Sequence, residues 1–155
     1  MKISNLALVS AVVGTFAAGI AMGDGHAADV VKQRNDVMEA LSKNLKTLGD
    51  MAKGEQAYDA AVAAEAATLL VAAAQIDPDT LYIEGTSTAE FEKTRAKPEI
   101  WDNLEDVKAK SAALADAAVA MEAAAGVDLA SLQAAMGPLG QSCGSCHKVY
   151  RAPKN

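Results

Sequence analysis

The stretch LASLQAAMGPLGQSCGSCHKVY, residues 129–150, shows how this chain folds. Its apolar residues recur at steps of three and four, which is the spacing of one face of an α-helix. These residues are Leu129, Leu132, Met136, Leu139, Cys143, Cys146 and Tyr150. Asp128, directly before the stretch, is of a type that caps helix N-termini. Pro138 lacks the N–H that a helical hydrogen bond needs, so we expect a kink or a new helix start there.

Three earlier segments have the same spacing. The first, with Asp29 as its expected N-cap and Gly54 as its end, has on one stripe Val31, Arg34, Met38, Leu41, Leu45, Leu48 and Ala52. The second, over about 55–75, has Tyr58, Val62, Ala66, Leu69, Ala73 and Ile76. The third, from Pro98 to Gly126, has Ile100, Leu104, Val107, Ser111, Leu114, Ala118, Met121 and Ala125.

Four amphipathic helices with two short links and one long connection, residues 77–97, predict an all-α fold, an antiparallel up-down four-helix bundle. The composition agrees, because 51% of the residues are hydrophobic but only 4% are aromatic, and Ala and Leu are strong helix formers. The net charge of −6 argues against nucleic acid or an anionic membrane as a partner. It is compatible with a soluble protein that meets basic partners.

Residues 1–27 have the pattern of a secretory signal peptide, with Lys2, an apolar stretch over 6–22 and small residues before Ala28. We therefore expect export to the periplasm, a mature domain of residues 28–155 and no membrane association after cleavage. An uncleaved membrane anchor is the alternative, although the stretch is short for a bilayer span. Cleavage also removes His26, which leaves His147 as the only histidine.

The pentapeptide Cys143-Gly144-Ser145-Cys146-His147 is the attachment motif of c-type haem. The two thiols form thioether links to the haem, and the histidine becomes an axial ligand of the iron. We expect one covalently attached haem c per chain, inside the bundle near the last helix. The alternatives for the cysteines are a redox dithiol, which normally follows a strand, and a zinc site, which needs four ligands. For the histidine, the alternative is a surface position.

Arg34 is on an apolar stripe, where an unpaired charge is costly. Haem has two propionates and Arg pairs with carboxylates, so we expect Arg34 to bind a propionate. The alternative is a side chain that extends into solvent at the bundle end. Asn35 is a second candidate for the same propionate. Met38 is expected on the distal face of the haem, either as a sixth iron ligand or as ordinary packing.

Together these features resemble the cytochrome c′ family over residues 31–151. The resemblance rests on Arg34-x-x-x-Met38, on AKGE at 52–55, on KPEIW at 97–101, and on GQSCGSCH at 140–147 followed by Tyr150-Arg151. It implies a periplasmic four-helix bundle, often a homodimer. In typical members His147 would be the only protein ligand of the iron, and the haem binds nitric oxide or carbon monoxide. Low-spin relatives use a first-helix methionine, here Met38, as sixth ligand and carry electrons.

We therefore expect a periplasmic c-type cytochrome with a five-coordinate, high-spin haem that binds small gases, transfers single electrons, or does both. The alternative is a low-spin electron carrier with His147 and Met38 both on the iron. We expect no enzymatic activity, because a peroxidase needs a distal acid–base group and the first stripe offers only Met38 there. The sequence does not define the redox partner.

Overall fold

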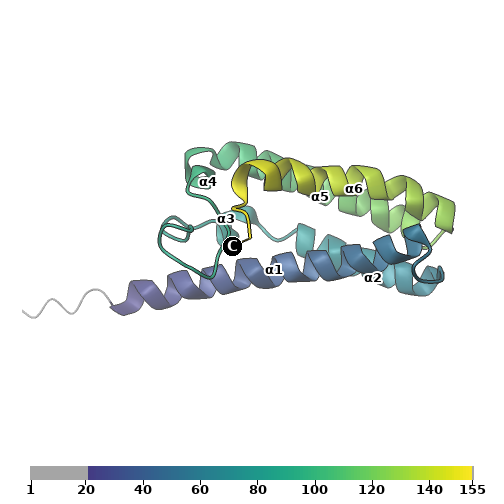
Figure 1. Cartoon of the computed structure of the whole chain (residues 1–155), viewed down its shortest axis with the longest axis horizontal. Coiled ribbons are helices and arrows are strands. Elements are labelled where there is room, and N and C mark those ends of the chain that lie inside the picture. The colour runs from purple at the N-terminus through teal and green to yellow at the C-terminus, as the bar shows by residue number, and fades with distance from the viewer. Residues whose placement is uncertain (1–20, 155) are drawn as a thin grey trace, which may run out of the picture.

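The computed structural model describes residues 21–154, with side chains from residue 25 onward, so most of the predicted signal peptide lies outside the described residues. Four long helices run side by side along the molecule (Figure 1). They are α1 (Ala21–Lys53), α2 (Ala60–Ala74), α5 (Leu104–Ala125) and α6 (Leu129–Tyr150). Two short helices, α3 (Pro78–Leu81) and α4 (Glu99–Asp102), lie between α2 and α5.

The long helices close into a ring, because α1 packs on α2 and α6, and α5 packs on the same two helices. Each helix therefore contacts its neighbours in the chain, which is the up-down order of an antiparallel bundle. The predicted all-α four-helix bundle is confirmed. No helix within residues 21–154 is both long and apolar enough to cross a membrane.

Capping residues fix where two of these helices begin. The Asp59 carboxylate accepts hydrogen bonds from the Ala61 and Val62 N–H groups at 2.9 and 3.0 Å. The Asp128 carboxylate accepts from the Ser131 N–H at 2.7 Å, as the sequence predicts. Gly54 has a φ of 77°, a conformation that favours glycine, and the chain turns there after α1.

Several predicted boundaries are wrong. The first helix begins at Ala21, so Asp29 lies inside it and is not its N-cap. The second begins only at Ala60, because the carboxylate that satisfies its first N–H groups is that of Asp59. The third is interrupted at Asn103, whose φ of −136° is not helical, so Pro98 precedes only the short α4. The fourth is continuous through Pro138, which excludes a new helix start there.

The predicted buried face of the second segment is wrong at two of its positions. Val62 and Leu69 are 39% and 50% exposed, whereas the buried positions are Ala63, Ala66, Ala67, Leu70, Val71, Ala73 and Ala74. Because α2 is rich in Ala, nearly every face of this helix is apolar in the sequence. The small Ala side chains let the neighbouring helices approach α2 closely, and the face that is buried includes Leu70 and Val71 but leaves Val62 and Leu69 outside.

The core lies along the bundle axis. Its most completely buried large side chains are Leu48, Met51, Leu70, Met121, Leu132 and Leu139. A smaller cluster at one end contains Ile100, Val107 and Tyr150, and Trp101 packs against it. This second cluster fixes the C-terminal end of α6 against α4 and α5, and the functional residues of α6 lie next to it.

Candidate functional site

Arg34 holds the long connection onto α1. The side chain is 3% exposed. Its guanidinium donates to the Leu81 and Thr86 carbonyls at 3.0 and 2.6 Å and to the Thr86 and Thr94 hydroxyls at 3.1 and 2.8 Å. The guanidinium also lies 5.6 Å from the centre of the Tyr82 ring. A side chain extending into solvent is therefore excluded, and the propionate contact stays a prediction.

Residues 93–97 join α1 to the C-terminus of α6. The Asn35 side-chain amide donates to the Lys93 carbonyl at 2.8 Å. On the other side, Ala96 and Arg151 form an antiparallel bridge, and the Arg95 Nε donates to the Ala152 carbonyl at 2.8 Å. These bonds place a stretch without helical periodicity across the gap between α1 and α6.

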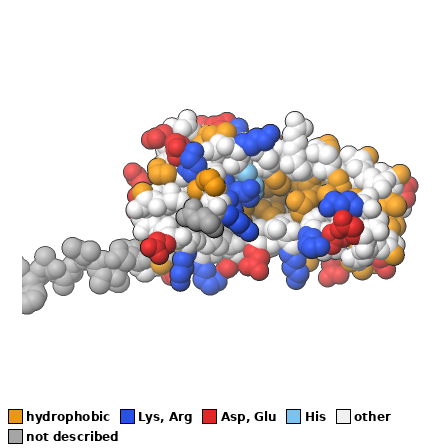
Figure 2. Space-filling view, viewed as in Figure 1, with side chains coloured by type: hydrophobic (Ala, Val, Ile, Leu, Met, Phe, Trp, Pro, Cys, Tyr) orange, Lys and Arg blue, Asp and Glu red, His pale blue; other side chains and the backbone are white. Residues whose placement is uncertain are grey.

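A cavity of about 500 Å³ lies between α1, α6 and this stretch. Its volume is within the range of cofactor sites, and its walls are mostly apolar, with Leu41, Leu45, Leu70, Leu114 and Leu139 among the lining residues. Figure 2 shows this apolar hollow with histidine at its edge and Lys and Arg side chains beside it. Most of the residues that the sequence analysis identifies as candidates for haem binding also line this cavity.

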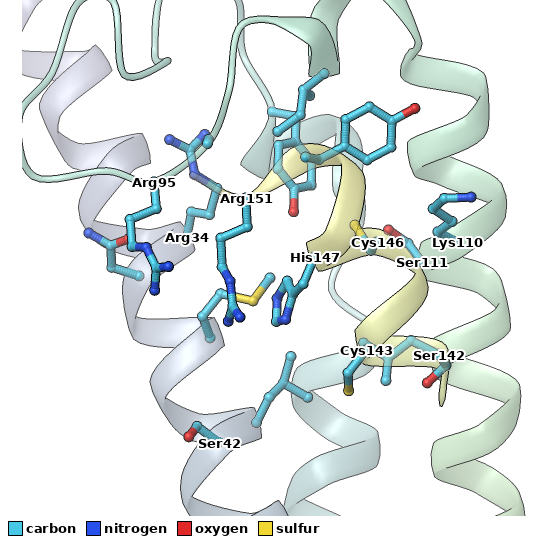
Figure 3. Close-up of a pocket in the computed structure, with 18 of the residues that line it drawn as sticks. Arg34, Ser42, Arg95, Lys110, Ser111, Ser142, Cys143, Cys146, His147 and Arg151 are labelled. Atoms are coloured by element: carbon cyan, nitrogen blue, oxygen red, sulfur yellow. The ribbon is translucent and has the colours of Figure 1, made fainter. Parts of the chain in front are cut away.

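Cys143, Cys146 and His147 all line the cavity from the last turns of α6. Figure 3 shows His147 pointing from α6 into the space in front of α1. Cys143 and Cys146 form no disulfide with each other, and burial raises the pKa of each thiol. A raised pKa disfavours the thiolate that a redox dithiol requires. Among the described residues no group of three or more His, Cys, Asp or Glu could hold a metal, which disfavours the zinc alternative.

His147 is half-buried rather than on the open surface. Burial lowers the pKa of its imidazole, and the neighbouring charges of Arg151 and Arg95 lower it further. The imidazole is therefore held in its neutral form, which has a nitrogen lone pair available for a metal. Two thiols and a neutral imidazole on one helix, facing an apolar cavity, fit a covalently bound haem.

Met38 is partly buried and lines the same cavity from α1. Its thioether therefore faces the cavity across from the helix that supplies the histidine. Arg34 and Asn35, one turn earlier, also line the cavity. The structure thus brings together all six candidate residues, although the described hydrogen bonds of Arg34 and Asn35 are made to the connection.

Sequence reasoning missed the residues that the connection supplies. Tyr82, Lys93 and Arg95 line the cavity, as does Lys110 of α5. Burial raises the pKa of Tyr82 to about 12, so its hydroxyl stays protonated. The connection has no hydrophobic period that would place its side chains, so no local signal in the sequence identifies them.

A four-helix bundle with a C-x-x-C-H motif on its last helix defines a c-type haem protein. Comparison with known proteins agrees. The sequence model of the family described as cytochrome c′ matches residues 29–151. This chain therefore belongs to the cytochrome c′ family and is a cytochrome that carries covalently attached haem c.

Individual relatives are similar over most of the chain. Cytochrome c-554 of Cereibacter sphaeroides is 43% identical over 122 residues, 79% of this chain and 80% of that protein. Cytochrome c′ of the same species is 38% identical over 128 residues, 83% of this chain and 86% of that protein. The solved structure of cytochrome c′ from Thermochromatium tepidum has a TM-score of 0.74 at 31% identity and covers 82% of this chain and 97% of its own.

Proposed function

We propose that Cys143 and Cys146 hold the haem by thioether links and that His147 is the axial ligand of its iron, in a protein exported to the periplasm. A bound haem supplies a one-electron iron couple and a coordination position for a diatomic gas. The observation that carries the proposal is that both thiols and the imidazole face one apolar cavity. The Leu side chains that line the cavity would give the haem apolar surroundings.

For the iron, we propose a five-coordinate, high-spin state that binds nitric oxide or carbon monoxide and exchanges single electrons. The apolar wall that Leu41 and Leu45 of α1 form supports this, because neither side chain has an atom that binds iron and a small uncharged gas can lie against both. A solved structure of cytochrome c′ from Alcaligenes xylosoxidans, 30% identical to this chain, carries bound nitric oxide.

A low-spin iron with His147 and Met38 both bound is the second candidate. The observation that favours it is the position of Met38, which lines the same cavity from the facing helix. Methionine is an established axial ligand in c-type cytochromes. In this case the protein would carry electrons and bind gases slowly, because a ligand must first leave the iron.

Optical spectra of the oxidised and reduced holoprotein, recorded for Met38→Leu and Met38→Ala, separate the two candidates. An unchanged spectrum and fast carbon monoxide binding in the unmodified protein support the five-coordinate state. A methionine-to-iron charge-transfer band that both substitutions abolish supports the six-coordinate state. Met136→Leu is the matched control, because Met136 packs against the core and is not among the cavity residues.

The attachment itself is tested by mass spectrometry. Replacing both Cys143 and Cys146 by serine should remove the covalently added haem mass, because each thioether link needs the sulfur atom of one of these cysteines. A colourless exported protein of unmodified sequence, with no added mass, would contradict the proposed attachment.

We also propose that the protein is not an enzyme. Peroxide cleavage needs a distal acid–base group, and the described residues facing the cavity from α1 are Arg34, Asn35, Met38, Leu41, Ser42 and Leu45. Arg34 is already hydrogen-bonded to four oxygens of the connection. Peroxide turnover by the holoprotein above that of free haem would contradict this proposal.

We propose in addition that two chains pair through the outer face of α2. Val62 and Leu69 are exposed on that helix, and burial of such side chains stabilises association. Sedimentation velocity should show a dimer that Leu69→Glu dissociates. A monomer at micromolar concentration of the unmodified holoprotein would exclude the pairing.

A further inference from the structure

The charges around the cavity oppose the charge of the whole chain. The protein has 14 Lys and Arg against 20 Asp and Glu, a net charge of −6. Yet the described residues that line the cavity include no Asp or Glu, and they include Arg34, Lys93, Arg95, Lys110 and Arg151. The charge around the cavity is therefore positive, although the composition of the chain gives a negative net charge.

Hydrogen bonds hold the backbone of Lys93 and the side chain of Arg95 in place beside the cavity. Arg95 donates to the Ala152 carbonyl at 2.8 Å, and the Lys93 carbonyl accepts from Asn35 at 2.8 Å. Lys110 instead forms an ion pair with Asp106 at 3.0 Å. In Figure 3, Arg151 lies beside His147, and Arg95 lies beyond Arg151 on the same side of the histidine. We call Lys93, Arg95 and Arg151 the basic rim.

A bound haem does not cancel this positive charge. Its two propionates offset at most two of the five cations, and the Lys110 pair accounts for a third. At least two positive charges remain next to the haem. Lys93 and Arg151 are exposed, so the remaining charge is presented to solvent.

We propose that the basic rim is the docking surface for an acidic protein that exchanges electrons with the haem. The inference rests on the proposed function, since it requires a redox-active haem behind the rim. A patch of one sign on a protein of the opposite net charge orients an encounter, because the partner is attracted only to that face. The overall charge of −6 by itself indicates basic partners. The positive charge at the cavity instead favours an acidic partner at the face where the electron would be transferred.

Stopped-flow kinetics of the holoprotein with reduced flavodoxin, an acidic one-electron donor, test the proposal. Raising the ionic strength from about 0.01 M to about 1 M shortens the Debye length from about 30 Å to about 3 Å. The rate constant is expected to fall about 10-fold or more over this range. A rate that rises with salt, or does not change, would overturn the inference.

Lys93→Glu and Lys53→Glu form a matched pair, because both replace an exposed lysine and change the net charge equally. Lys53 is in the last turn of α1 and does not line the cavity. Lys93→Glu should slow the low-salt reaction about fivefold or more, and Lys53→Glu less than twofold. Equal effects would show that only the total charge matters and would overturn the docking surface. Lys93→Gln provides the same comparison if the glutamate variant does not fold.

Nuclear magnetic resonance supplies a readout independent of electron transfer. Adding oxidised flavodoxin to the labelled holoprotein should shift amide signals of residues 93–97 and 147–152 most. Shifts centred on α2 would contradict the proposal. Absence of a redox-active haem would instead refute the proposed function. The optical spectrum shows whether the haem is present before any partner is added, so the two failures can be distinguished.

Discussion

The guanidinium of Arg34 carries a full positive charge and is surrounded by uncharged carbonyl and hydroxyl oxygens. Burial lowers the pKa of its guanidinium, but arginine remains protonated in proteins. Four hydrogen bonds to residues 81, 86 and 94 replace the water that the charge has lost. One side chain of α1 thus fixes a connection that has little regular structure of its own, and this connection forms one wall of the cavity in which we propose the haem.

Arg34→Met should lower the free energy of unfolding by about 3 kcal/mol, because the substitution leaves buried acceptors on the connection without donors. Urea unfolding of the holoprotein, followed by circular dichroism, measures the change. Lys32→Ala on the same helix is the control, since Lys32 is exposed and its pair with Asp36 is screened by water, so little change is expected. Equal effects of the two variants would show that Arg34 does not hold the connection.

At the scale of elements, α5 and α6 meet through a hydrogen bond next to the haem motif. The Tyr150 hydroxyl donates to the Asp106 carboxylate at 2.7 Å, and the Lys110 ammonium lies 3.0 Å from the same carboxylate. Tyr150 is buried in the small end cluster. The bond therefore orients the last turn of α6, three residues after His147.

Replacing Asp106 by Asn should destabilise the fold in a pH-dependent way. The hydrogen bond from Tyr150, and then the one from Lys110, lower the pKa of Asp106 in the folded protein. The carboxylate therefore stabilises the fold above the unfolded pKa of about 3.9, and this contribution is lost as the pH falls through the folded pKa. The urea midpoints of the two proteins should differ at pH 7 and converge on acidification. A pH-independent difference would contradict this assignment.

Replacing each of two glycines by alanine should change the stability of the protein in opposite directions. At Gly126, after α5, a Cβ would come 3.2 Å from the Ala64 Cβ of α2, so Gly126→Ala should lower stability by about 1 kcal/mol. At Gly140, inside α6, nothing lies within 4 Å, so Gly140→Ala should raise it by about 0.5–1 kcal/mol. Thermal unfolding compares both with the unmodified protein. An increase in stability for Gly126→Ala would show that this contact with α2 is not close-packed.

At the scale of the whole molecule, the start of α1 extends beyond the bundle (Figure 1). Residues 25–29 are exposed or half-buried, and full burial begins at Val30. The expected cleavage before Ala28 would therefore remove helical turns that contribute little packing. It would also bring Asp29 into the first turn of the shortened helix, where an acidic residue is favourable.

The exported protein should therefore begin at Ala28, as measured by intact mass. Its free energy of unfolding should match that of a chain retaining residues 21–27 within about 0.5 kcal/mol, because the removed residues leave the core intact. A mass that retains residues 1–27 would support the membrane-anchor alternative. A large loss of stability on removing residues 21–27 would show that they pack against the bundle.

Features that depend on neighbours along one helix could be predicted from the amino-acid sequence alone. The spacing of Cys143, Cys146 and His147 places two thiols and an imidazole on successive turns, and this spacing is the same in any fold that keeps the helix. Three of the four apolar stripes agree with the burial in the structure for the same reason. A period of 3.6 residues is a local property, so it can be read directly from the sequence.

Features that depend on contacts between distant segments could not be predicted from the sequence, because these contacts form only when the chain folds. Arg34 meets Thr86 and Thr94 across more than fifty residues of sequence, and no local pattern pairs them. Packing against α1 and α5 determines which face of the Ala-rich α2 is buried. The positive cavity in a negative protein arises because the fold brings Lys93, Arg95 and Arg151 to the same site. Periodicity predicts which side of a helix is apolar, but the positions of irregular segments follow from packing, which no local pattern encodes.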